Sequence, residues 1–221
     1  MKLQTNLLCV VTLAVCMVGY AQNLLLNGDF ESGNSGFFSD YNYNSDLNGE
    51  GRYVVGYNPQ SHHSHTGGNF GDHTTGSGLM LIANGQTSSV QTIWRETISV
   101  EPGEHYYFQY FAASWGAAPG QNIDASPSLL QLRVGGHNVG VPLTLPSLVG
   151  DWVSFNASWT ATQTEDILEI IDLNTTFGGN DFVLDDLSVI AVPEPTNVTL
   201  TVLAVCLYWS LKVRKNYSEQ N

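Results

Sequence analysis

The chain has 221 residues and a formal net charge of −13, with 20 acidic residues against only 7 lysines and arginines. Four of these cations lie near the ends of the chain, at Lys2, Lys212, Arg214 and Lys215. The part between them is strongly acidic and repels phosphate backbones, which excludes nucleic acid as a partner. Neutral glycans and divalent cations remain compatible with such a surface.

Residues 1–21 have the pattern of a secretory signal peptide. Lys2 gives a short cationic start, and residues 7–18 form an apolar stretch. Gly19-Tyr20-Ala21 then places small residues at the two positions that a signal peptidase reads. We expect cleavage after Ala21 and export of the chain that follows.

Residues 22–191 suit one domain in length. The three cysteines lie outside this range, so the domain must fold without disulfides even in an oxidising compartment. Short segments rich in Val, Ile, Tyr, Phe and Thr alternate with clusters of Gly, Asn, Asp and Ser, which is typical of an all-β chain. We expect strands at residues 24–31, 51–57, 78–83, 89–100, 105–113, 129–134, 137–141, 151–160, 165–173 and 181–190.

Two of these segments have informative side-chain patterns. In residues 151–160 large apolar residues alternate with small polar ones, which predicts a strand with one wet face. In residues 105–113 aromatic residues occupy both faces, which predicts a central strand whose outer face is covered or lines a groove. About nine or ten strands without intervening helices favour an antiparallel two-sheet sandwich. Residues 58–75, rich in Gly, His, Ser and Asn, predict a long functional loop.

Three stretches of this domain resemble galactose-binding-like jelly-roll modules. They are the opening stretch 23–31, the segment 71–85 and the closing stretch 181–189. The resemblance spans nearly the whole domain and implies a jelly-roll sandwich of the carbohydrate-binding-module type. Such modules bind many different ligands, so the resemblance is more specific for the fold than for the function.

Carboxylates in the opening and closing stretches form the first candidate site. The resemblance implies that these two strands are neighbours, so a carboxylate from each can share a Ca²⁺ ion, which takes six to eight oxygen ligands. Asp186 has the strand parity of Phe182 and Leu184, which predicts that it points inward and is the better ligand of the last strand. We therefore expect a structural calcium site formed by Asp29, Glu31, Asp185 and Asp186.

A glycan-binding strand face is the second candidate. Sugar recognition combines an aromatic platform with amide and guanidinium groups that bond hydroxyls. Trp94 and Trp159 are expected in the core, whereas Trp115 lies in a loop and is expected to form the exposed platform. The arginines can instead simply pair with surface carboxylates. The candidate ligand-binding residues are Gln91, Arg95, Tyr107, Gln109, Trp115, Gln131 and Arg133.

Two further patterns give weaker indications. The histidines of residues 62–65, with Asp72 and His73, match no metal-binding spacing and favour a hydrogen-bonding loop over a zinc or copper site. No nucleophile elbow, metalloprotease helix or phosphate-binding loop occurs. Glu96 and Glu169 are the mid-strand carboxylates that a jelly-roll glycosidase would need. We expect no enzyme activity, with a surface polysaccharide hydrolase and a structural matrix protein without specific ligand as the alternatives.

Residues 192–221 form a three-part pattern. Pro193-Glu194-Pro195 is followed by an apolar segment at residues 196–211 and a basic tail at residues 212–221. Cations directly after an apolar segment place the C-terminus in the cytoplasm. The segment has 16 residues, fewer than the about 20 that a membrane-spanning helix needs, which argues against a plain permanent anchor.

This pattern resembles the PEP-CTERM sorting signal of Gram-negative bacteria. The resemblance implies export through the inner membrane, transient anchoring by one C-terminal hydrophobic helix, cleavage by an exosortase, and delivery to the cell surface or extracellular matrix. The sequence therefore predicts an exported, non-catalytic jelly-roll module that binds a glycan or exopolysaccharide.

Overall fold

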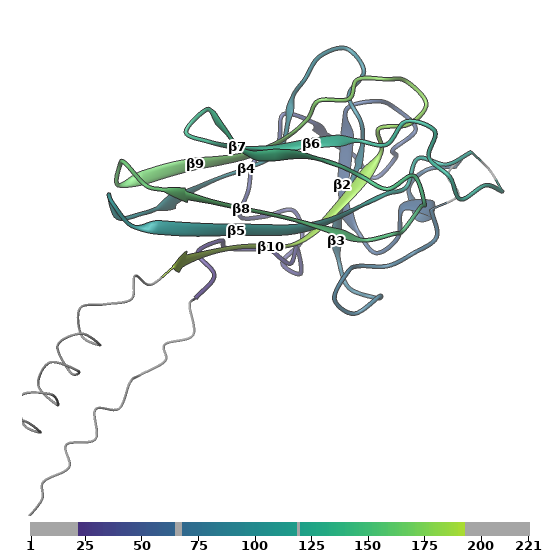
Figure 1. Cartoon of the computed structure of the whole chain (residues 1–221). Helices are drawn as coiled ribbons and strands as arrows, with labels where there is room; N and C mark the ends of the chain where they lie inside the picture. The colour runs from purple at the N-terminus through teal and green to yellow at the C-terminus, as the bar shows by residue number, and fades with distance from the viewer. Residues whose placement is uncertain (1–21, 65–67, 119, 193–221) are drawn as a thin grey trace, which may run out of the picture.

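The computed structural model describes residues 22–64, 68–118 and 120–192. The expected signal peptide and sorting signal, at residues 1–21 and 193–221, lie outside these residues. Within the described ranges, two β-sheets pack as two layers (Figure 1). The helical structure of this part of the chain is one 3₁₀ turn at Pro59–Ser61, and no helix in it is long and apolar enough to cross a membrane.

The larger sheet has six strands in the order β1-β2-β3-β10-β5-β8, and the smaller has four in the order β4-β9-β6-β7. All pairs are antiparallel except β1 with β2, which is parallel. The strands are β1 (Asn42–Tyr43), β2 (Arg52–Gly56), β3 (Met80–Asn84), β4 (Thr92–Ser99), β5 (His105–Ser114), β6 (Leu129–Val134), β7 (His137–Thr144), β8 (Val153–Thr160), β9 (Glu165–Asp172) and β10 (Phe182–Val192).

The expected all-β sandwich is confirmed for the described residues, and nine of the ten expected strands occur within three residues of their expected ends. The short strand β1 was not expected from the sequence. The strand expected at residues 24–31 is wrong, because this stretch is a series of turns and bends.

Turn-forming contacts explain why residues 24–31 do not form a strand. Asn27 folds its side-chain amide onto two carbonyls of the following turn, and Phe30 adopts a φ of 55°. The stretch still runs alongside β10, where Leu187 N donates to Gly28 O at 2.8 Å. The approach is so close that a Cβ on Gly28 would lie 1.9 Å from Leu187 O, so only glycine fits there.

The main hydrophobic core lies between the two sheets. It takes Trp94 and Leu132 from the smaller sheet and Phe108 and Leu184 from the larger one. The expectation that Trp94 lies in the core is confirmed, since its side chain is 1% exposed. Trp159 is half-buried at the edge of this core.

A second apolar cluster lies on the outer side of the six-stranded sheet. Because successive strand residues face opposite sides, the residues between those of the main core supply this cluster, and all five residues of β3 are buried. Phe70, from the loop at residues 58–75, packs against it, so that loop covers the sheet face. The cluster consists of Leu47, Val54, Met80, Ile82, Ala113, Trp115 and Val183.

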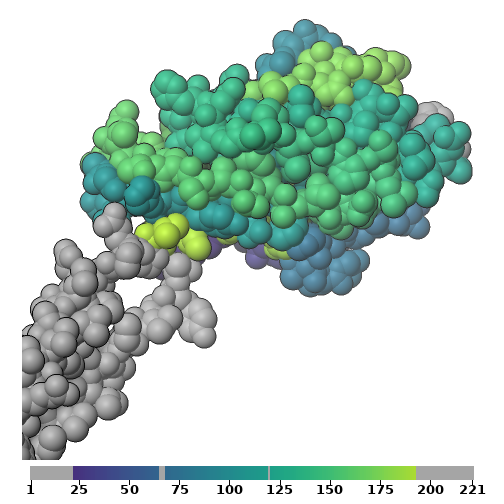
Figure 2. All heavy atoms as spheres, in the orientation of Figure 1, coloured from purple at the N-terminus to yellow at the C-terminus, as the bar shows by residue number. Residues whose placement is uncertain are grey.

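One end of the sandwich, here called the loop end, carries the candidate site. There β3, β5 and β9 finish and β10 begins (Figure 1). Figure 2 shows the loop after β3, in blue, beside the loop after β9, in light green. Asn180 Nδ2 joins the two loops by donating to Gln86 O at 3.3 Å.

Candidate binding site

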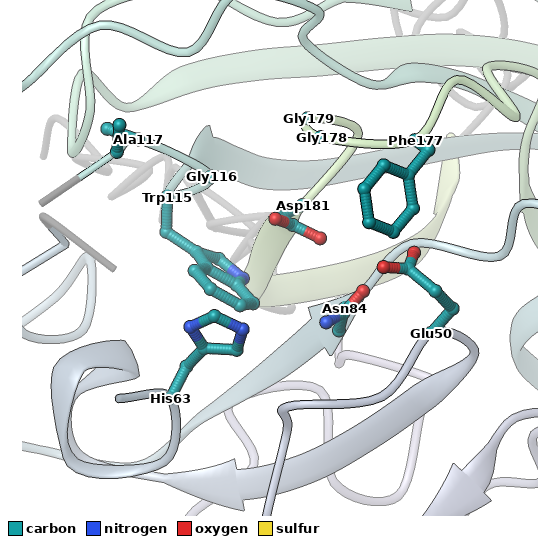
Figure 3. A pocket seen from close by; sticks show the side chains of 11 residues that line it. Glu50, His63, Asn84, Trp115, Gly116, Ala117, Phe177, Gly178, Gly179 and Asp181 are labelled. Atoms are coloured by element: carbon teal, nitrogen blue, oxygen red, sulfur yellow. The ribbon is translucent and has the colours of Figure 1, made fainter. Parts of the chain in front are cut away.

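A pocket of about 270 Å³ opens at the loop end (Figure 3). Residues 116–118 after β5 and residues 177–179 before β10 line two of its sides. Its polar side chains are those of Glu50, His63, Asn84 and Asp181. The volume is slightly below the ~300 Å³ at which pockets for drug-sized ligands begin, so it suits a single small ring or a short polar group.

Trp115 belongs to the inner wall of this pocket and is fully buried. Its indole N–H donates to Ala83 O at 2.9 Å and is 3.1 Å from Phe182 O. His63, from the loop at residues 58–75, packs on the indole with ring centroids 5.4 Å apart. The expectation of an exposed Trp115 platform is wrong, because the second apolar cluster takes this ring into its interior.

The exposed aromatic ring at the pocket is that of Phe177, which is 78% exposed. It lies in the loop at residues 173–181, and an asparagine anchors each end of this loop. Asn174 Nδ2 donates to Ser126 O at 2.9 Å, and Asn180 Nδ2 donates to Asn174 O at 2.8 Å. The anchored loop presents the ring beside the pocket (Figure 3). Sequence reasoning missed Phe177, although an apolar ring between polar residues and a glycine pair was a signal.

Two carboxyl groups line the pocket. Asp181 Oδ1 accepts from Gly85 N at 3.0 Å. Asp181 Oδ2 lies close to Gly116, since a Cβ added to this glycine would be 2.6 Å from it. No hydrogen-bond donor in the described part of the chain reaches Asp181 Oδ2 or the carboxylate of Glu50. Burial and the nearby Glu50 carboxylate raise the pKa of Asp181 well above its usual value, and burial also raises the pKa of Glu50.

Asn84 adds a third hydrogen-bond acceptor to the pocket. Its side chain is 3% exposed, and Nδ2 donates to Leu47 O at 2.7 Å, which fixes the orientation of the amide. Oδ1 has no partner among the described residues. A buried acceptor without a partner costs about 1–3 kcal/mol, so a donor supplied by a ligand would be stabilising here.

Two more acids are buried near this pocket. Asp124 Oδ1 accepts from Ser126 N at 2.8 Å, and Asp172 Oδ1 accepts from Asn174 N at 2.9 Å. The second oxygen of each carboxyl group is buried and has no partner in the residues described. Burial raises the pKa of Asp124 to about 6 and that of Asp172 to about 7. The loop end therefore concentrates carboxyl groups that form no ion pair with a cationic side chain of the described residues.

The expected glycan-binding residues are spread over several surfaces. Arg95 and Arg133 lie on the four-stranded sheet, with Glu169 between them in register. Tyr107 and Gln109 belong to β5 of the other sheet. Gln131 is only 2% exposed, and its amide donates to Leu132 O and Val139 O. Gln91 precedes β4 and accepts from Gln86 Nε2 at 3.4 Å.

The charges of the four-stranded sheet, here called the arginine row (Arg95, Glu169 and Arg133), pair with their neighbours. Arg95 lies 3.4 Å from Glu169 and 3.2 Å from Asp40. Arg133 Nε donates to Asn138 Oδ1 at 3.3 Å. The alternative in which an arginine pairs with surface carboxylates is confirmed for Arg95.

A shallow hollow of about 410 Å³ lies on the other sheet, between the N-terminal stretch and β10. Gln109 and Phe111 line it from β5. Its position brings Gln109 close to Asp29 and Asp186, both of which also line the hollow. Gln109 is thus separated from the arginine row by the thickness of the sandwich.

The expected calcium ligands act as hydrogen-bond acceptors in this structure. Glu31 Oε1 accepts from Leu79 N at 2.7 Å, and exposed Asp29 accepts from the backbone N of Glu31 at 3.3 Å. Asp185 Oδ2 accepts from His73 N at 2.9 Å. In the described ranges, no three side chains of His, Cys, Asp or Glu are arranged to hold a metal ion. The arrangement is a hydrogen-bond network around residues 72–79.

The expectation that Asp186 points inward is wrong. The β-ladder shifts register between Asp185 and Ser188, and Asp186 adopts a φ of 49°. This bulge places Asp185 and Asp186 on the same, outer side of the six-stranded sheet, where Asp185 accepts from His73 N and is 1% exposed, while the Asp186 side chain is 28% exposed. Asp186 Oδ2 instead lies 2.7 Å from His73 Nδ1 and also accepts from the Thr74 hydroxyl.

The described histidines at residues 62–73 make hydrogen bonds or ring contacts, and the two candidate catalytic glutamates lie on opposite faces of the four-stranded sheet. His62 Nδ1 lies 3.0 Å from Ser45 O, and His73 stacks on Phe111 with ring centroids 3.7 Å apart, while His65 lies outside the described residues. Glu96 is buried towards the main core and accepts from Leu26 N, whereas Glu169 is on the outer face. The two glutamates therefore do not form an opposed pair.

No protein-family model matches the chain. Halomucin of Haloquadratum walsbyi is 21% identical over 183 residues, which are 83% of this chain, and the chain spans about 2% of the length of halomucin.

Two solved structures have a similar fold. TmCBM61 in complex with β-1,4-galactotriose is 13% identical with a TM-score of 0.51, covering 78% of this chain and all of that one. A cyclase from Fischerella sp. TAU in complex with 4-(1H-indol-3-yl)butan-2-one is 14% identical with a TM-score of 0.52, covering 80% of this chain and all of that one. The chain thus shares its fold with a protein whose structure contains β-1,4-galactotriose and with a cyclase.

Proposed function

We propose that the domain is a non-catalytic glycan-binding module and that the pocket at the loop end is its binding site. One observation carries the proposal: the acceptors of Asp181, Glu50 and Asn84 that receive no hydrogen bond from the described residues lie beside the exposed ring of Phe177. Sugar hydroxyls are donors that such acceptors can bind, and the apolar side of a sugar ring stacks on an aromatic face.

The shared fold supports this proposal at the level of architecture. TmCBM61, whose structure contains β-1,4-galactotriose, is aligned over its whole length with this domain. The rival surface hydrolase is less well supported, because Glu96 and Glu169 lie on opposite faces of the four-stranded sheet.

Glycan binding at the pocket is tested with a glycan array followed by titration of any glycan that binds. Phe177→Ala should weaken binding at least tenfold, because it removes the exposed platform. Phe38→Ala is the matched control, since Phe38 is 73% exposed beside β4 and away from the pocket. Equal binding by wild type and Phe177→Ala would overturn the assignment of the pocket, and an array without a single bound glycan would favour the structural matrix protein.

We further propose that the protein is exported and released at the cell surface by an exosortase. The sequence of residues 193–215 supports this proposal, with its Pro-Glu-Pro motif, apolar segment and cations in that order. The mass of the surface-released protein tests it. Retention of Lys212 and the residues after it would overturn processing, and changing both Pro193 and Pro195 should block release.

We also retain the structural calcium site as a proposal, with Asp185 in place of Asp186 as the buried ligand of the last strand. Glu31 and Asp72 support it, since a Cβ on Gly78 would lie 2.2 Å from Glu31 Oε1 and 3.2 Å from the Asp72 carboxyl group. Asp185 is also close enough to Asp72 for that charge to raise the Asp185 pKa, after the larger effect of burial. Carboxylates so close together attract a hard cation.

A further inference from the structure

We propose that the loop-end pocket binds a primary ammonium group, so that the preferred unit of the glycan is an amino sugar with a free amine. The sugar part of this inference rests on the proposed function. The amine part rests on the chemistry of the pocket alone, which combines acceptors without donors, an excess of carboxylates and aromatic rings.

The number and kind of polar groups match an ammonium ion. The pocket offers Asp181 Oδ2, the Glu50 carboxylate and Asn84 Oδ1, and none of them receives a hydrogen bond within the described part of the chain. An ammonium group carries three donors and no acceptor. Each of its N–H groups can therefore meet one of the three acceptors, whereas a hydroxyl supplies a single donor.

The acceptors are available because the neighbouring donors are already used. Asn84 Nδ2 donates to Leu47 O, and the indole N–H of Trp115 donates to Ala83 O. Asn84 is the most important of the three residues. It is only 3% exposed, and its Oδ1 still has no hydrogen-bond partner among the described residues. Such an atom can accept a hydrogen bond from a ligand that enters the pocket.

The described residues place no lysine or arginine at the pocket. The described residues contain no lysine, and their three arginines are engaged elsewhere. Arg52, the nearest to Glu50 in sequence, bonds Asp46 O at 2.9 Å and its carboxylate at 3.3 Å. Arg95 and Arg133 lie on the four-stranded sheet. An ammonium group bound in the pocket would therefore meet no lysine or arginine of the described residues.

The aromatic surroundings favour an organic cation over a metal ion. Trp115, His63 and Phe177 line the same pocket (Figure 3), and a cation beside aromatic faces gains electrostatic attraction. A metal ion such as Ca²⁺ needs more oxygen ligands than the pocket supplies. The described residues also place no three metal-binding side chains of His, Cys, Asp or Glu together. An amine on a saturated ring satisfies both the acceptors and the rings.

Calorimetric titration of the domain with three trisaccharides tests the amine. The glucosamine trimer should bind at least tenfold more tightly than the N-acetylglucosamine trimer and cellotriose, because acetylation or replacement by hydroxyl removes the charge. Glu50→Gln and Asp181→Asn should each reduce that preference to less than about threefold. Asp181→Asn keeps the acceptor for Gly85 N and so maintains the fold, which its melting temperature checks.

A matched control separates the pocket from the general acidity of the protein. Glu165→Gln removes one negative charge from an exposed position on β9, so the net charge changes by the same amount. This variant should retain the wild-type preference for the amine. An equal loss in Glu165→Gln would mean that the amine is attracted by net charge alone, which overturns the inference.

A second probe keeps the inference independent of glycan binding. Cyclohexylamine should shift the NMR signals of the Trp115 indole and the Phe177 ring, and cyclohexanol at the same concentration should not. This result with no trisaccharide bound would reject the proposed function and keep the ammonium site. Equal binding of all three trisaccharides, lost in Phe177→Ala, would keep the glycan function and reject the ammonium site.

Discussion

The arginine row and the loop-end pocket are both rich in ionisable groups, but the carboxyl groups form ion pairs in the row and, among the described residues, none in the pocket. In the row, Arg95 lies within 3.4 Å of Glu169 and within 3.2 Å of Asp40, so its charge is matched inside the protein. In the pocket, Glu50 and Asp181 are both acidic and lie close to two further buried acids. The charge of Arg95 is paired within the protein, whereas the carboxyl groups of the pocket have no cationic partner among the described residues and can take one from a ligand.

The contributions of the two regions to folding stability also differ. Exposed ion pairs contribute about 0–1 kcal/mol to stability, so the arginine row has a small effect on folding. A buried acceptor without a partner, such as Asn84 Oδ1, costs about 1–3 kcal/mol. The pocket, whose unpaired buried groups destabilise the folded state, is therefore more informative about function than the arginine row, whose charges are paired, because perturbed buried groups gather at functional sites.

The largest expected effect is a difference in stability between a variant of the pocket wall, Trp115→Ala, and a variant of its rim, Phe177→Ala. Trp115→Ala should destabilise the domain by about 3–5 kcal/mol, because it opens a cavity in the second apolar cluster and leaves two carbonyls without their donor. Phe177→Ala should change stability by less than about 0.5 kcal/mol, because its ring is exposed. Urea denaturation measures both, and similar losses in the two variants would contradict this division of roles.

The second expected effect is a fall in stability with rising pH. Burial raises the pKa of Asp172 from 3.8 to about 7, so between about pH 4 and pH 7 the folded state keeps a proton that the unfolded chain has lost. Stability therefore decreases through this window and stays low above it, and Asp172 contributes on the order of 2–4 kcal/mol to the decrease. Denaturation at a series of pH values measures it.

Asp172→Asn is the variant that assigns this pH dependence. Asparagine keeps the acceptor for Leu129 N and Asn174 N but does not ionise. The variant should lose less stability than the wild type between pH 5 and pH 8. Exposed Asp151→Asn is the control and should keep the wild-type slope. A wild-type domain that becomes more stable from pH 5 to pH 7.5 would contradict the burial of ionisable acids at the loop end.

The third expected effect concerns calcium at the carboxylates of Glu31 and Asp185, beside the loop at residues 72–79. If Glu31 and Asp185 bind Ca²⁺, the ion should stabilise the folded state by about 2.7 kcal/mol at 100 times its Kd. The double change Glu31→Gln and Asp185→Asn should remove this response. Melting curves with calcium and with a chelator measure it, and identical curves for the wild type would leave the carboxylates as hydrogen-bond acceptors of the 72–79 loop.

Much of the fold could be predicted because it depends on local patterns. The strand at residues 129–134 was predicted with both ends correct, since a glycine pair follows it directly. The alternation in residues 153–160 likewise identified β8. The stretch at residues 24–31 was predicted incorrectly, because the side-chain amide of Asn27 and the positive φ of Phe30 compete with a strand, and neither is a matter of hydrophobic pattern.

The candidate site was harder to predict because it depends on contacts between distant segments. Glu50, Asn84 and Asp181 belong to three separate strands or loops, and no spacing in the sequence relates them. The bulge after Asp185 reversed the expected inward and outward faces, since a single extra residue exchanges them. Trp115 was expected to be exposed because it lies in a loop, but the second apolar cluster takes up its ring.

The smallest expected effect tests the arginine row itself. Arg133 is half-exposed and donates to exposed Asn138, so Arg133→Ala should change stability by no more than about 0.5 kcal/mol. Glycan affinity should stay within about twofold of the wild type, because the row lies on the four-stranded sheet and not at the loop end. The same titration that detects the loss in Phe177→Ala measures this variant. If Arg133→Ala abolished binding while Phe177→Ala did not, the strand face predicted from the sequence would be the binding site. The acceptors of the pocket would then have to be explained by ordered water, which can also satisfy buried polar groups.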